Sequence, residues 1–172
     1  MLLLGAIDPA PLIALLGARG LELRTVDDGE PITGSYWGEP EAGVVGGTVF
    51  ARADTPVHSV LHEASHLLVL PPDRRARVHT DASDSVAEED AACYLQIVLA
   101  NHLPGVGCAR IMADMDAWGY TFRLGSARAW FERDAAEVRD WLFTRGLLDG
   151  IDGPDRTPSA LAPRPTAPSV VQ

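Results

Sequence analysis

The sequence predicts an α+β fold, in which a small antiparallel sheet of about three strands packs on a central helix and a helical C-terminal half follows. Short apolar runs separated by turn sequences occupy the N-terminal third, and helical periodicity dominates from residue 57 to 146. The chain has 172 residues, of which 47% are hydrophobic, and this is enough for the core of one domain. We therefore expect a single domain over residues 1–149.

The first third of the chain predicts one helix and three strands. Residues 9–19 carry leucine and isoleucine at near-helical spacing, and Gly20 suits the position just after a helix. Short apolar runs then lie between turn sequences such as Asp-Asp-Gly. These runs predict strands over residues 21–26, 32–37 and 44–51.

The rest of the domain is expected to be helical. A helix is predicted over residues 57–70, because Pro56 fits its first turn and Pro71-Pro72 ends it. A polar loop follows over residues 73–85. The remaining helices are expected at residues 85–102, 107–118 and 126–146. Residues 150–172 are rich in Pro and Ala with few large apolar groups, so we expect a disordered tail there.

Charge and composition exclude several classes of function. All 14 basic residues are Arg, and with 24 acidic residues they give a net charge of −10. Such an acidic surface repels phosphate backbones, so we expect no direct binding of nucleic acid. A chain without lysine forms no Schiff base and no P-loop phosphate site. No apolar run has the length of a membrane span, and the N-terminus lacks the basic region of a signal peptide, so we expect a cytoplasmic protein that does not enter the membrane.

The helix predicted over residues 57–70 contains the HExxH motif His62-Glu63-Ala64-Ser65-His66. Residues four apart lie on one face of a helix, so the imidazoles of His62 and His66 can bind the same metal ion. Glu63 can then act as the general base for a water molecule at that ion. The pattern predicts a catalytic metal site, and the ligand types favour Zn²⁺. The alternative is a helix that carries two histidines and a glutamate by coincidence.

A catalytic zinc site needs a third protein ligand, and the next predicted helix begins with acidic residues. Five acids lie within ten residues, namely Asp81, Asp84, Glu88, Glu89 and Asp90. The helix dipole also favours acids at this end of a helix, so their position alone does not identify the ligand. Either Glu88 or Glu89 can face the histidines.

The order of these elements resembles the ImmA/IrrE family of small gluzincin-type HExxH metallopeptidases. The resemblance rests on the strand over residues 44–50 and on the helix over residues 56–70 with its HExxH motif. A third segment is similar to the family's third-ligand helix, and it reads Glu88-Glu89-Asp90-Ala91-Ala92-Cys93-Tyr94-Leu95. The resemblance covers residues 9–105 and leaves residues 106–149 as a helical extension.

The resemblance implies that Glu88 is the third ligand beside His62 and His66, because it falls on the first Glu of the family pattern Glu-x-Glu-Ala-Asn-x-Phe-Ala. Ala92 stands where the family prefers Asn, so Glu89 remains open as the alternative. The resemblance also implies limited proteolysis of a regulatory protein, often a transcriptional repressor. The expected partner is therefore a protein or peptide substrate, which can pair with the edge of the strand beside the cleft.

Two further interpretations and three further residues remain open. The chain can be a regulatory or protein-binding module that zinc organises without catalysis, although such a site has no need of the general base Glu63. It can also hydrolyse a small amide. His58 lies one turn before the motif, but three histidines along about 12 Å of helix do not reach one ion, so we interpret it as an ordinary polar residue. His79 and Tyr36 are weak candidates for a donor to the transition state.

Overall fold

The computed structural model describes residues 1–82 and 85–148, and it has the predicted α+β architecture with a helical C-terminal half. Asp84 and the predicted tail at residues 150–172 lie outside the described residues. In chain order the elements are η1 (Leu4–Ala6), α1 (Ala10–Gly17), β1 (Glu22–Thr25), β2 (Gly43–Val45), β3 (Thr48–Ala51), α2 (Val57–Val69), α3 (Pro72–Arg75), α4 (Val86–Ala100), α5 (Gly107–Trp118), α6 (Ala127–Arg133) and α7 (Ala136–Thr144).

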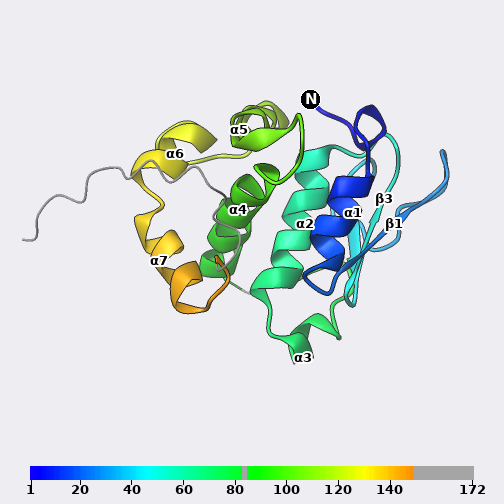
Figure 1. Ribbon diagram of the computed structural model, residues 1–172, viewed down its shortest axis with the longest axis horizontal. Helices are drawn as coiled ribbons and strands as arrows, with labels where there is room; N and C mark the ends of the chain where they lie inside the picture. The colour runs from blue at the N-terminus through cyan, green and yellow to red at the C-terminus, as the bar shows by residue number, and fades with distance from the viewer. Residues whose placement is uncertain (83–84, 149–172) are drawn as a thin grey trace, which may run out of the picture.

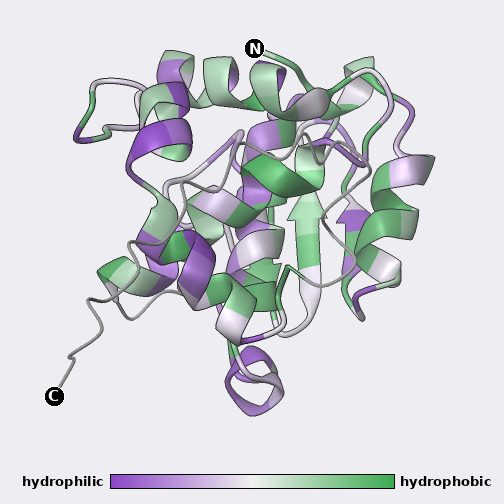
Figure 2. Ribbon diagram, turned by 60° about the vertical axis from the view of Figure 1, so that its left-hand side comes forward, coloured by the Kyte–Doolittle hydropathy of each residue, from purple (hydrophilic) through white to green (hydrophobic). Residues whose placement is uncertain are grey.

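Helix α2 lies at the centre of the molecule, with the sheet and α1 on one side and α4 on the other (Figure 1). Eleven of its thirteen residues are buried, and the two that are not are His62 and Glu63. Polar segments collect at the periphery, as Figure 2 shows for the purple α3 at the bottom of the view. None of the helices in the described part of the chain combines the length and the apolar character needed to cross a bilayer.

The sheet is mixed and not antiparallel as expected, with the strand order β1-β3-β2. β1 pairs with β3 in parallel, and β2 pairs with β3 in antiparallel. The strand predicted over residues 44–51 is in fact the β2–β3 hairpin, whose turn contains Gly46 at a φ of 57°. A glycine at positive φ allows this tight turn, which reverses the chain and makes β3 run parallel to β1.

Residues 32–37 do not form the predicted strand. They belong to a loop that we call the 32–42 loop. Among residues 32–37, only Ser35 forms an isolated β-bridge, and its partner is Gly43. The loop crosses β2 so closely that a Cβ atom on Gly43 would lie 2.1 Å from the carbonyl oxygen of Thr33. Its end is fixed to α2, because the Ala42 backbone N–H donates to Ser59 Oγ at 3.0 Å. The loop is thereby held beside the middle of the molecule.

The helices after α2 differ from the prediction at two places. The short helix α3 lies at the start of the predicted loop over residues 73–85, where Pro72 suits its first turn. Ser85 caps α4, and its hydroxyl accepts a hydrogen bond from the Glu88 backbone N–H. The single helix expected over residues 126–146 is divided into α6 and α7 by a break after Arg133. Both helices bury apolar residues, such as Trp130 and Leu142, in the same core, so the apolar pattern continues across the break.

Candidate metal centre

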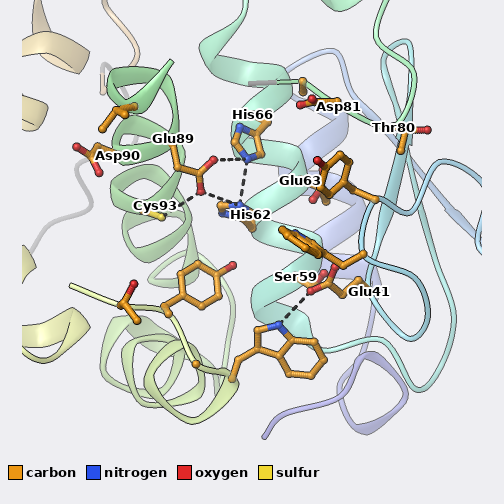
Figure 3. A pocket seen from close by; sticks show the side chains of 18 of the residues that line it. Glu41, Ser59, His62, Glu63, His66, Thr80, Asp81, Glu89, Asp90 and Cys93 are labelled. Atoms are coloured by element: carbon orange, nitrogen blue, oxygen red, sulfur yellow. Dashed lines mark hydrogen bonds and ion pairs between the residues drawn. The ribbon is translucent and has the colours of Figure 1, made fainter. Parts of the chain in front are cut away.

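Helices α2 and α4 lie side by side and place three potential metal ligands together (Figure 3). His62 Nε2 and His66 Nε2 are 3.0 Å apart. One carboxylate oxygen of Glu89 lies 3.4 Å from His62 Nε2, and the other lies 3.3 Å from His66 Nε2. These three side chains form a group that can hold a metal ion.

The three side chains are close enough to bind one small ion. In a tetrahedral site with bonds of 2.0–2.1 Å, neighbouring ligand atoms are about 3.3 Å apart. The two imidazole nitrogens are 3.0 Å apart, and they lie 3.4 and 3.3 Å from different oxygens of Glu89, so the carboxylate spans both rings. One ligand atom from each residue lies within 4.8 Å of the other two, so a small adjustment of the side chains would let them bind one ion.

The protonation states of two of these side chains also suit a metal. The pKa of Glu89 is lowered, chiefly by its interaction with His62, so the carboxylate is ionised at neutral pH. Burial lowers the pKa of His66 to about 3, so this ring is neutral. Metal ligands must be an ionised carboxylate or a neutral imidazole, so these two groups are ready to bind an ion. His62 differs, because burial alone would lower its pKa, but its hydrogen bonds with Cys93 and Glu89 outweigh the burial and raise the pKa well above the ordinary value. This ring must therefore lose a proton when an ion binds.

The structure brings Glu89, and not the expected Glu88, to the two histidines. The Glu88 carboxylate instead accepts two hydrogen bonds from Arg74, at 2.7 and 3.2 Å. Consecutive residues of a helix point about 100° apart, so only one of the two glutamates can face α2. The alternative that the sequence left open is thus favoured, and Glu88 connects α4 to the short helix α3.

Glu63 lies next to the first histidine and lines the same cleft. Burial raises the pKa of its carboxyl to about 7, and the nearby carboxylates of Glu41, Glu89 and Asp81 raise it further, while His62 lowers it. A carboxyl with a pKa close to neutrality is suited to accept and return a proton at physiological pH.

The cleft above these residues has a volume of about 790 Å³. Its walls come from the 32–42 loop, from residues Thr80 to Ala82, from the first turns of α4 and from the segment that follows α5. A volume of this size is typical of a ligand site.

The edge of β2 is not free for a peptide, which corrects the expected pairing of a substrate with the strand over residues 44–50. The Val44 backbone N–H donates to the Gly34 carbonyl oxygen at 3.2 Å, and its carbonyl oxygen accepts from the Thr80 N–H at 3.0 Å. The segment from Thr80 to Ala82 therefore lies between β2 and the cleft. Thr80 has a φ of 74°, which is uncommon for a β-branched residue.

The other residues considered from the sequence lie in different environments. His58 is fully buried, and its ring contacts those of Trp118 and Tyr120 at centroid distances of 5.4 and 5.8 Å. Burial lowers its pKa to about 4, so it is a neutral part of the core. His79 is exposed and bonds to the hydroxyl of Thr80, and it is not among the residues that line the cleft. Tyr36 lies at the cleft, but on a loop.

Tyr120 is a residue of the site that sequence reasoning missed. Its ring lies edge-to-face against that of His62, with the centroids 5.6 Å apart, and it lines the cleft. Burial raises the pKa of its hydroxyl, so it remains protonated and able to donate a hydrogen bond. It follows α5 at a position with no motif and outside the resemblance, so the sequence carried no signal for it.

Comparison of the chain with protein-family models, with curated proteins and with solved structures gave no match. The resemblance to the ImmA/IrrE family therefore stays a prediction from the residues quoted for it.

Proposed function

We propose that the protein is a zinc-dependent metallopeptidase, with His62, His66 and Glu89 as metal ligands and Glu63 as the general base. One observation carries the proposal: two histidines and a carboxylate offer ligand atoms within 4.8 Å of one another in a cleft that Glu63 also lines. Two imidazoles and one carboxylate are a common ligand set of catalytic zinc. Limited cleavage of a regulatory protein is the activity that we expect from the sequence resemblance.

Residues of the cleft have different roles in the proposed peptide hydrolysis. Bound Zn²⁺ supplies a Lewis acid that polarises the scissile carbonyl and lowers the pKa of water. Glu63 accepts a proton from the attacking water molecule and returns it to the leaving amine, for which its pKa near 7 is suited. The Tyr120 hydroxyl donates a hydrogen bond to the carbonyl oxygen as negative charge develops there.

Metal content tests the ligand set without any knowledge of the substrate. Mass spectrometry of the native protein, purified without added metal, should find about one zinc ion per chain. Glu89→Gln should lower zinc affinity by more than the 10–100-fold that is typical of residues outside the ligand set. Glu88→Gln is the matched control, and it should bind zinc more tightly than Glu89→Gln. Zinc binding that Glu89→Gln leaves unchanged would overturn the assignment.

Peptidase activity is tested with a library of peptides and mass-spectrometric identification of the cut sites. The zinc-loaded protein should cleave a subset of the library, and Glu63→Gln should retain zinc but cleave nothing. A zinc-loaded wild-type protein that cleaves no peptide and no partner protein would refute the proposal. It would leave a zinc-organised binding module as the better description.

A further inference from the structure

The 32–42 loop presents two large aromatic rings to solvent at the cleft. The side chains of Tyr36 and Trp37 are 55% and 81% exposed, and their rings meet edge-to-face at 5.0 Å. Both residues line the cleft that contains the metal centre. Aromatic surface of this extent is costly to leave in water, and beside a cleft it is typical of a site that binds a ligand.

Glu41 lies on the same loop, and its carboxylate is held in place. It accepts a hydrogen bond from Trp118 Nε1 at 3.0 Å, and burial raises its pKa. Among the described residues Glu41 forms no ion pair with an arginine. A partly buried carboxylate of this kind gains most from a cation that enters the cleft with the ligand.

The whole cleft is acidic. Of the residues that the structure describes, five acids line it, namely Glu41, Glu63, Asp81, Glu89 and Asp90, and no arginine does. A divalent ion would balance two of these charges, those of Glu63 and Glu89, and the charge of Glu41 would remain. Glu41 and Glu63 line the same cleft, so Glu41 faces the space in which a peptide would bind.

We propose that the cleft recognises an arginine side chain of the peptide substrate, held between the rings of Tyr36 and Trp37 and the carboxylate of Glu41. A guanidinium group stacks on aromatic rings and also donates parallel hydrogen bonds to a carboxylate, so one side chain satisfies both features. Lysine offers a point charge without the planar face. The inference names the substrate class of the proposed peptidase, but the binding that it describes does not depend on catalysis.

The test measures binding in zinc-loaded Glu63→Gln protein, so that cleavage does not interfere. The probes are fluorescent eight-residue peptides of mixed aliphatic sequence with capped ends, each with one central arginine or with citrulline, its uncharged isostere. Fluorescence anisotropy should give about tenfold tighter binding of the arginine peptides. Adding Glu41→Gln should remove most of this difference, because Gln retains the bond to Trp118 but not the charge. Glu132→Gln is the control, because Glu132 is an exposed acid on α6 that does not line the cleft; it should leave the difference between arginine and citrulline peptides unchanged.

The outcomes separate this inference from the proposed activity. Equal binding of arginine and citrulline peptides would overturn the arginine site, even if the wild-type protein cleaves peptides. Cleavage of a library at sites without an enriched arginine would overturn it too. A preference for arginine that depends on Glu41, in a protein that cleaves nothing, would support the site and count against the peptidase.

Discussion

Replacing Glu63 by Gln should stabilise the metal-free protein while it abolishes catalysis. In the fold, burial raises the pKa of this carboxyl from its ordinary value of 4.5 to about 7. The ionised form is therefore less favourable in the folded protein than in the unfolded chain. Gln has nearly the same shape and no charge, so the variant avoids this cost.

The sign and the size of the effect follow from the two pKa values. Below about pH 4.5 the carboxyl is protonated in both states and costs nothing; the cost grows as the pH rises and is complete above pH 7. Full ionisation then costs at most about 3 kcal/mol. Because the side chain is partly exposed to the cleft, we expect the advantage of the variant to grow by about 2 kcal/mol between pH 5 and pH 8.

Urea unfolding of the chelator-treated wild-type protein and of Glu63→Gln, at pH 5 and at pH 8, measures this difference. Glu89→Gln is the control with the opposite sign, because the pKa of Glu89 is lowered in the fold and its carboxylate stabilises the metal-free protein at pH 8. An advantage of Glu63→Gln that is the same at both pH values, or one that shrinks at pH 8, would refute the reasoning.

Three other substitutions test residues around the centre. His58→Leu should stabilise the protein, and its advantage in the free energy of unfolding should rise by about 2 kcal/mol from pH 7 to pH 5. Burial holds the pKa of His58 near 4, so the histidine of the unfolded chain takes up a proton first as the pH falls. Urea unfolding measures this, and a stability difference that is independent of pH would contradict it. Arg74→Met removes the pairing with Glu88 that fixes the first turns of α4, so zinc affinity should fall about tenfold in a chelator competition, and unchanged affinity would contradict this role. Tyr120→Phe should lower kcat about a hundredfold and leave zinc affinity unchanged, whereas a loss of zinc affinity instead would assign Tyr120 a structural role.

The helices and the two histidines could be predicted from the sequence because the signals for them are local. Helix α2 spans residues 57–69 against a prediction of 57–70, since Pro56 and Pro71-Pro72 limit it on both sides. The spacing of the motif places His62 and His66 on one face in any α-helix. No knowledge of the tertiary structure is needed for either conclusion.

The strands and the third ligand depend on tertiary contacts and could not be fixed in this way. Residues 32–37 have the composition of a strand, but the chain there crosses β2. It pairs with β2 only through the Ser35–Gly43 bridge and the hydrogen bond from Val44 to Gly34. The choice between Glu88 and Glu89 depends on the rotation of α4 about its axis. Arg74 on α3 hydrogen-bonds to Glu88, and Glu89 is the glutamate that faces the histidines. No local pattern in the sequence indicates this arrangement.

The burial pattern of α2 explains why the motif lies in a helix that is otherwise so apolar. A helix buried on nearly all sides shields its side chains from water, and of its residues only His62 and Glu63 are not buried. The same burial raises the pKa of Glu63 toward neutrality and keeps His66 unprotonated, as catalysis and metal binding require. These polar groups cost stability while the site is metal-free, and bound metal offsets part of that cost. The features that weaken the metal-free fold are therefore those that suit the site for hydrolysis.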